Sequence, residues 1–255
     1  MPDPTVLRVG KYFYLTCSSL NYSPGLIIRR SSDLINWETV CSVFSEDLGD
    51  VWAPELARHN GIHRFFLKPG SRVLYQEKHI GTGKGAGLRS IDPVTEAYLE
   101  ENAVLEMDTA QIGGVDHTLR KTKATAAAGA KLRIRERILT EGEQDARTEF
   151  EVELAGEGSG ADIVSRAVAR GKSHQEYTST IIGNAPCTGH SECDAIIDGE
   201  ATVDAAPKLC AHHGDAALIH EAAIGKIAGE QILKLRTLGL TEQEAEARII
   251  EGFLS

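Results

Sequence analysis

The chain of 255 residues is 42% hydrophobic and 25% charged, which excludes a wholly disordered protein. Its formal net charge of −10 and pI of about 5.4 disfavour a surface for nucleic acid or anionic membranes. No apolar run approaches the roughly 20 residues that cross a bilayer, and residues 1–20 lack the basic start and apolar stretch of a secretion signal. We therefore expect a soluble, cytoplasmic protein that binds neither nucleic acid nor membrane.

Aromatic residues divide the chain into two parts. Nine of the fourteen lie within residues 1–66, and no tryptophan follows Trp52. This asymmetry predicts two parts with different cores, joined near Leu67.

The first part, residues 1–66, begins with a predicted β-hairpin. Residues 6–9 and 12–16 are short β-rich runs on either side of a Gly-Lys turn. Two more short runs follow around residues 26–28 and 37–40. Short aromatic-rich strands at this spacing predict an antiparallel β fragment, a partial blade of a β-propeller.

This part resembles the start of glycoside hydrolase family 43, the five-bladed propellers that cleave arabinosides and xylosides. The resemblance rests on the segments PDPTV (2–6), YFYL (12–15), SSDLINWE (31–38) and WAPEL (52–56). It implies that Asp3 is the general base, whereas glycoside hydrolysis also needs a second carboxyl group as the acid. The family takes that acid from later blades, for which we find no matching segment. An arabinoside or xyloside glycosidase is therefore the alternative function.

Residues 67–212 contain many short segments in which apolar and polar residues alternate. Examples are 104–108, 132–135 and 149–154. Such alternation buries one face of a strand and leaves the other in solvent. Small residues such as the run 126–130, together with few aromatics, suit a narrow core in which successive coils stack. These patterns predict a right-handed parallel β-helix in a mainly β protein.

The last part, residues 213–255, changes to a helical period. Apolar residues within 216–235 approximate one helical face. Thr241 and Glu244 then form a capping box that opens a second helix. We expect these two helices to cap the end of the β-helix.

Residues 67–255 resemble the SufB/SufD family, the scaffold components of iron–sulfur cluster assembly. The resemblance rests on GNAPC (183–187), GHSECDAII (189–197), HEAAIGKI (220–227) and GLTEQEA (239–245). It implies an assembly scaffold rather than an enzyme, which carries a transient iron–sulfur cluster. The implied partners are a SufC-type ABC ATPase on the C-terminal helical region, a cysteine desulfurase or sulfur carrier, and a SufB/SufD-type homologue or a second copy of this chain.

Cysteines and histidines near the end of the predicted β-helix form the candidate site. Thiolates carry persulfide sulfur and bind iron, and imidazole or carboxylate completes a coordination shell. The family resemblance places Cys193 at the position of the sulfur acceptor and matches His220 and Glu221 to a functional His-Glu pair. Spacing adds further possible metal ligands, namely Cys187, His190, Cys210 and His212.

Each of these residues also has a purely structural interpretation. For Cys187 and Cys193 to share an ion, the segment between them must turn, which Gly189 permits; otherwise buried cysteine is a small apolar core residue. Cys210 and the histidines after it fit an exposed loop, and the His-Glu pair fits a polar helix N-terminus. A third hypothesis is a fusion in which neither part keeps a complete site.

Overall fold

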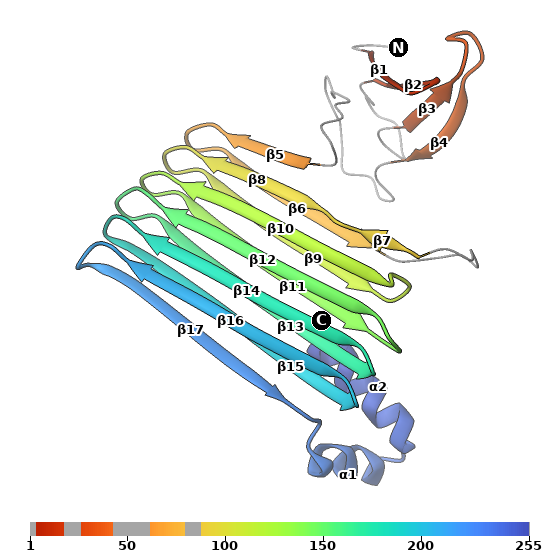
Figure 1. The fold of residues 1–255 in the computed structure, drawn as a ribbon, viewed down its shortest axis with the longest axis vertical. Helices are drawn as coiled ribbons and strands as arrows, with labels where there is room; N and C mark the ends of the chain where they lie inside the picture. Colours follow the sequence, from red (N-terminus) through yellow and green to blue (C-terminus); the bar gives the residue numbers. More distant parts are fainter. Residues whose placement is uncertain (1–3, 18–26, 43–61, 80–87, 255) are drawn as a thin grey trace. The chain divides into compact units, whose positions relative to one another are not determined.

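The computed structural model describes residues 4–17, 27–42, 62–79 and 88–254 (Figure 1). Contacts within the chain divide it into two compact units, Met1–Gly61 and Ile62–Ser255. Asp3 and the segment 52–56 lie outside the described residues.

The first unit holds a four-stranded antiparallel sheet. Its strands are β1 (Thr5–Val9), β2 (Tyr12–Thr16), β3 (Ile27–Ser31) and β4 (Glu38–Ser42), in the order β1-β2-β3-β4. Gly10 takes a φ of 59° in the turn between β1 and β2. The structure confirms the predicted hairpin and the antiparallel fragment, whose strand order is that of a propeller blade.

The SSDLINW segment forms the connection between β3 and β4. The Asp33 carboxylate accepts hydrogen bonds from the backbone N–H groups of Ile35 and Asn36 at 2.9 and 2.8 Å. The bond from Asn36 is the largest cause of the lowered pKa of Asp33. This part of the motif therefore acts as a turn that one carboxylate holds together.

The second unit is a parallel β-helix in which each turn gives one strand to each of two sheets (Figure 1). The first sheet contains β5 (Ile62–Leu67), β8 (Val94–Leu99), β10 (His117–Ala126), β12 (Asp145–Leu154), β14 (His174–Gly183) and β16 (Thr202–Ala211), with the short β7 (Ser90–Ile91) beside β10. The second sheet contains β6 (Arg72–His79), β9 (Val104–Ile112), β11 (Lys131–Thr140), β13 (Gly160–Gly171), β15 (Cys187–Gly199) and β17 (Ala216–Gly225). All neighbouring strands in both sheets are parallel, which confirms the predicted β-helix.

Strict alternation of side chains places the core between the two sheets. The buried residues of β12 are Ala146, Thr148, Phe150, Val152 and Leu154. Register partners lie 28 or 29 residues apart in the chain, as for His117 with Asp145 and Asp145 with His174. Every turn therefore repeats the same inward and outward positions.

A column of glycines forms one corner of the β-helix. Gly142, Gly171 and Gly199 occupy successive turns with φ values of 64°, 73° and 74°, a region that favours glycine. A Cβ atom on Gly171 would lie only 3.1 Å from the backbone nitrogen of Gly142. The Lys172 N–H donates to the Gly142 carbonyl at 2.7 Å. Successive corners thus stack backbone on backbone.

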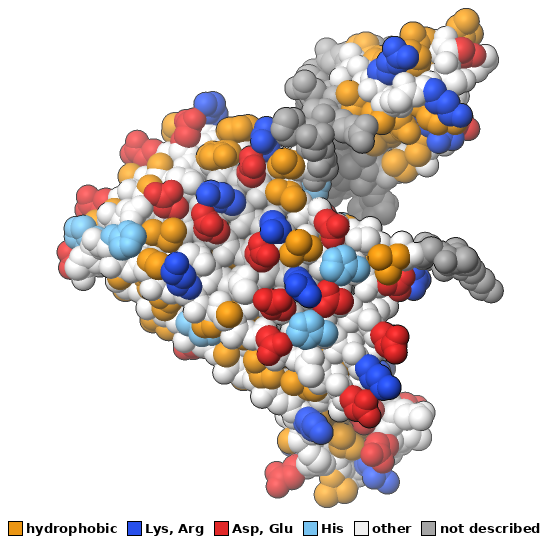
Figure 2. Space-filling model, in the orientation of Figure 1, with side chains coloured by type: hydrophobic (Ala, Val, Ile, Leu, Met, Phe, Trp, Pro, Cys, Tyr) orange, Lys and Arg blue, Asp and Glu red, His pale blue; other side chains and the backbone are white. Residues whose placement is uncertain are grey.

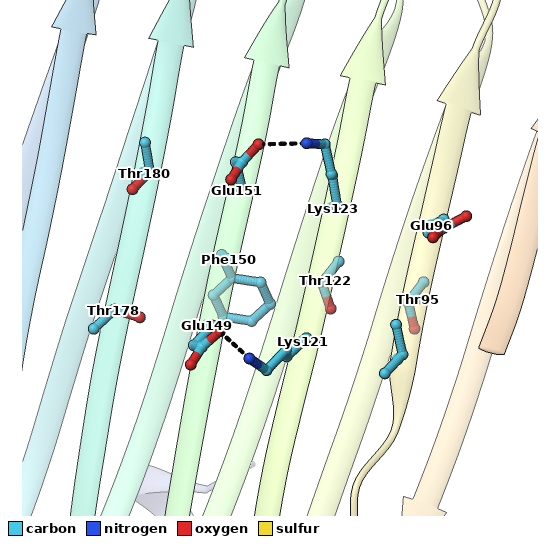
Figure 3. Close-up of a pocket in the computed structure, with 11 residues that line it drawn as sticks. Thr95, Glu96, Lys121, Thr122, Lys123, Glu149, Phe150, Glu151, Thr178 and Thr180 are labelled. Atoms are coloured by element: carbon cyan, nitrogen blue, oxygen red, sulfur yellow. Dashed lines mark ion pairs between the residues drawn. The ribbon is translucent and has the colours of Figure 1, made fainter. Parts of the chain in front are cut away.

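Charges of both signs mix over the face of the β-helix seen in Figure 2. On the outer face of the first sheet, ion pairs join register neighbours: Lys121 lies 3.0 Å from Glu149, and Lys123 lies 2.7 Å from Glu151 (Figure 3). These residues line a hollow of about 360 Å³. Because exposed ion pairs contribute only about 0–1 kcal/mol each, the pairs help to specify the register more than they stabilise the fold.

Two helices end the chain, α1 (Gly229–Thr237) and α2 (Glu242–Phe253). The predicted capping box of α2 is confirmed, because the Thr241 hydroxyl accepts from the Glu244 N–H at 3.3 Å. Arg166 of β13 lies over the Phe253 ring and donates to the Phe253 carbonyl at 3.3 Å. Of the helices described, none is both long and apolar enough to span a membrane.

The helix predicted within residues 216–235 is wrong over its first half. Ala216–Gly225 is strand β17, which pairs with β15, and α1 begins only at Gly229. Apolar residues at Leu218 and Ala222 suit a period of two as well as a helical face. The free edge of β15 decides between them, since pairing satisfies backbone groups on both strands.

The division of the structure also differs from the expected junction near Leu67. Phe65 and Phe66 belong to β5, which pairs with β8 in the second unit. The Phe66 ring stacks on Tyr98 of β8 with centroids 5.1 Å apart. The high aromatic content thus extends one strand into the β-helix.

Stability measurements test the glycine corner. We expect Gly171→Ala to lower the free energy of unfolding by about 2–4 kcal/mol, since it adds left-handed backbone strain to a close backbone contact. Gly113→Ala is the matched control, because Gly113 has a φ of 71° but open space around it; we expect a loss of about 1–2 kcal/mol. Equal losses in urea unfolding would contradict the stacked corner.

Candidate functional site

Cys193 lies on β15 with its side chain directed into the β-helix. It is 1% exposed, and the register places it beside Ser165 of β13 and Ala222 of β17. A cavity of about 10 Å³ borders it and is lined also by Tyr177 and Gln175. This volume is about the least that holds one water molecule. The space beside the sulfur therefore admits about one further small group.

The surroundings of Cys193 oppose ionisation of its thiol. Burial, followed by the charges of Glu136 and Asp194, raises the pKa of Cys193 to about 12. The thiol is therefore protonated at neutral pH and unreactive while it stays buried. A bound metal ion would displace this proton.

His220 faces the interior from β17, the strand next to β15. It is the register partner of Ser191, which lies two residues from Cys193 on the same face of β15. Neighbouring strands lie about 4.8 Å apart. The His220 Nδ1 atom is buried and has no hydrogen-bond partner among the described residues. An interior thiol and an imidazole with an unused nitrogen thus lie on adjacent strands.

A chain of buried charges, which the sequence analysis did not identify, lies in the same interior. The Glu136 carboxylate is 2% exposed and accepts hydrogen bonds from Ser165 at 2.9 Å and Thr148 at 3.1 Å. Arg120 Nε lies 3.4 Å from Glu136 and its Nη1 donates to Glu77 at 2.8 Å. Burial raises the pKa of Glu136. The available signal was a glutamate at an inward position of the alternating segment LRIRERIL.

Glu221 lies on the outer face of β17, the opposite face from His220. His190 and Glu192 of β15 lie beside it, and one potential ligand atom from each of the three side chains lies within 4.8 Å of the others. His190 Nε2 is 3.9 Å from Glu221 Oε2. Within the described part of the chain, this is the one such group of three. The structure therefore separates Glu221 from Cys193 and His220 and brings it together with His190.

Asp162 of β13 holds the His190 ring in place. His190 Nδ1 lies 2.9 Å from Asp162 Oδ1, and Arg135 donates to Asp162 Oδ2 at 2.8 Å. Burial alone would raise the pKa of Asp162, but its hydrogen bonds with His190 and Arg135 outweigh burial and lower it. Burial, followed by the interaction with Asp194, raises the pKa of Glu192. Sequence analysis did not identify Asp162 or Glu192; the 28- or 29-residue repeat was the signal that could have found them.

The expected turn at Gly189 is wrong. Strand β15 runs without a break from Cys187 to Gly199, and a Cβ atom on Gly189 would lie 2.8 Å from the Leu218 side chain. Glycine at this position thus makes room for Leu218. Cys187 is six residues from Cys193, which is about 20 Å along an extended strand. The two thiols cannot share one ion.

Cys187, Cys210 and His212 lie apart from the sites above. Burial raises the pKa of Cys187. Cys210 is the register partner of Ile182 on the outer face of the first sheet, and His212 Nδ1 lies 2.9 Å from Asn184 Oδ1. All five cysteines are free thiols. Metal roles for these three residues stay predictions.

Two family models match the chain. The one described as glycosyl hydrolases family 43 matches residues 1–79, and the one described as SUF system FeS cluster assembly, SufBD core domain, matches 63–195 and 187–253. Both matches include residues 63–79, whose strands pair within the β-helix. Asp3 lies outside the described residues, so a glycosidase that uses it as a base stays a prediction.

The chain is also similar to curated archaeal proteins, each named an iron-sulfur cluster assembly SufBD family protein. One from Methanothermobacter thermautotrophicus is 30% identical over 203 residues, which is 78% of this chain and 48% of the relative. One from Archaeoglobus fulgidus is 42% identical over 108 residues, 40% of this chain and 28% of the relative. The chain thus spans half or less of the length of these two relatives.

Alkylation tests the burial of Cys193. In the native protein we expect iodoacetamide to modify Cys193 at least about tenfold more slowly than the exposed Cys41, with peptide mass spectrometry as the measurement. The thiol of Cys193 stabilises the fold below its unfolded pKa of about 8.5, and this contribution is lost as the pH rises towards its folded pKa of about 12. Equal rates at both cysteines in the folded chain would contradict the interior position.

Proposed function

Because the chain belongs to the SufBD family of iron–sulfur cluster assembly proteins, we propose that it acts as an assembly scaffold of the SufB/SufD type rather than as an enzyme. It collects sulfur and iron as substrates and releases them together as a cluster. The observation that carries this proposal is the pairing of Cys193 and His220 on one interior face of adjacent strands.

Cys193 is the proposed sulfur acceptor. Its thiolate attacks the outer sulfur of a persulfide on a cysteine desulfurase or sulfur carrier, so that a new S–S bond forms at Cys193 and the donor cysteine leaves as a thiolate. The cavity beside Cys193 supports this step, because it has room for about one small group. Since burial keeps the thiol protonated, transfer needs a local opening that admits the donor and removes the proton.

His220 is the proposed second donor. Thiolate and imidazole are ligands that suit iron and its sulfur clusters. The unpartnered Nδ1 of His220 supports this role, since an unpaired buried nitrogen is unfavourable unless something binds it. Two donors leave coordination positions open for sulfide and for ligands from a partner chain.

A SufB/SufD-type homologue or a second copy is the proposed partner at the last turn. Strands β16 and β17 end their sheets, and a sheet edge offers backbone groups to another strand. Ile219 and Ile224 are exposed on β17. Pairing here would cover His220 and supply the missing ligands from the second chain.

A SufC-type ABC ATPase is the proposed partner of the C-terminal helices. No residue of α1 is buried, and Leu233 of α1 and Leu238 directly after it are among the most exposed large apolar side chains described. Exposed apolar side chains of this kind mark interaction surfaces.

Cluster formation tests the scaffold. Under anaerobic conditions with ferrous iron, cysteine and a cysteine desulfurase, we expect visible charge-transfer absorption in the wild type and its loss in Cys193→Ala. Cys41→Ala removes one exposed thiol from the other unit and should leave the signal unchanged. A signal that survives in Cys193→Ala would sink the proposed acceptor, and no signal in the wild type would sink the scaffold.

Binding measurements test the ATPase surface. We expect Leu233→Glu to weaken the binding of a SufC-type ATPase at least about tenfold, because it places a charge in an apolar contact. Leu74→Glu is the matched control: Leu74 on β6 is 63% exposed and Leu233 is 62% exposed. Biolayer interferometry measures both, and equal affinities for the two variants would argue against docking on α1.

A further inference from the structure

A separate group of ligands lies on the outer face of β15 and β17. His190 and Glu192 alternate along β15, and Glu221 of β17 is the register partner of Glu192. One potential ligand atom from each lies within 4.8 Å of the others. Because Cys193 faces the interior, the proposed sulfur acceptor has no part in this group.

Asp162 determines which nitrogen of His190 is available. Nδ1 lies 2.9 Å from Asp162 Oδ1 and is therefore the donating nitrogen of a neutral ring. Nε2 then carries the lone pair, which faces Glu221 Oε2 at 3.9 Å. A carboxylate that accepts from the far nitrogen of a histidine is typical of metal ligands, since it orients the ring and makes it more basic.

A cation is needed to balance this group. The lone pair and two carboxylates repel one another at these separations. The neighbouring arginines are engaged elsewhere, because Arg135 donates to Asp162 at 2.8 Å and Arg166 donates to the Phe253 carbonyl at 3.3 Å. Ligand atoms about 2.1 Å from a tetrahedral ion lie about 3.4 Å apart, so small rotations of two glutamate side chains close the site.

We propose that His190, Glu192 and Glu221 bind one divalent first-row transition-metal ion of borderline hardness, such as Fe²⁺. One imidazole and two carboxylates suit such an ion. Asp162 is the positioning residue that holds His190. This inference goes beyond the proposed function, because the site lies on the opposite face of the sheet from Cys193 and binds its ion without sulfur.

The test is an anaerobic calorimetric titration of the full chain with ferrous ion alone, without sulfide or desulfurase. We expect one ion per chain, a loss of affinity of at least about tenfold in His190→Gln and Glu192→Gln, and a loss of about 10–100-fold in Asp162→Asn. His117→Gln is the matched control: His117 Nδ1 lies 3.1 Å from Asp145 on the other sheet, outside any described group of three ligands. It should bind as the wild type does.

Cobalt absorption distinguishes a ligand from a positioning residue. At saturation, Asp162→Asn should keep the band positions of the wild type because its ligands are the same, whereas His190→Gln should shift them. A folded wild type that binds no ion would overturn the site and leave an ion-pair network around protonated His190. Equal affinities in wild type and His190→Gln would overturn it too.

The scaffold proposal is tested separately by the same titration. Cys193→Ala should bind ferrous ion with unchanged affinity while it forms no cluster. Loss of cluster formation in that variant therefore leaves the outer site untouched, and loss of ion binding in His190→Gln leaves the role of Cys193 untouched.

Discussion

Parallel strand pairing in an unbroken register is the interaction on which the rest of the second unit depends. Partners 28 or 29 residues apart stack turn on turn, and side chains alternate along each strand. Whether a residue lines the interior thus depends only on its place in this alternation. His220 and Glu221 are neighbours in sequence, yet one faces the dry interior and the other faces solvent. A motif that is continuous in the chain therefore serves two separate surroundings.

The interior is unusually polar for a core made of small and aliphatic side chains. Buried charges are unfavourable unless they are paired and hydrogen-bonded, and breaking one such pair leaves an uncompensated charge at about 3–5 kcal/mol. Glu136 meets this requirement through Ser165, Thr148 and Arg120. Because Ser165 is also the register partner of Cys193, the same network that satisfies the carboxylate holds the wall beside the thiol. Stability and site geometry share these contacts.

The sequence allowed the β-helix, the capping box and the candidate residues to be predicted, because alternation and capping are local patterns. It did not allow β17 to be told from a helix, since Leu218 and Ala222 fit both periods and only the free edge of β15 decides. Gly189 was expected to turn the chain, but its lack of a Cβ serves the packing of Leu218 instead. The association of His190 with Asp162 depends on register across turns, which no local pattern reveals.

The end position of β17 has a consequence for access to the buried thiol. In a solenoid each turn is held mainly by its neighbours, so the terminal turn has support on one side only and opens at the lowest free energy. Strand β17 is that terminal strand and covers Cys193 through its pairing with β15. Fraying of a single strand, without unfolding of the remainder, uncovers the sulfur. Hydrogen exchange along the second sheet would then fall in steps from β17 inward, with the reactive cysteine one step from the edge.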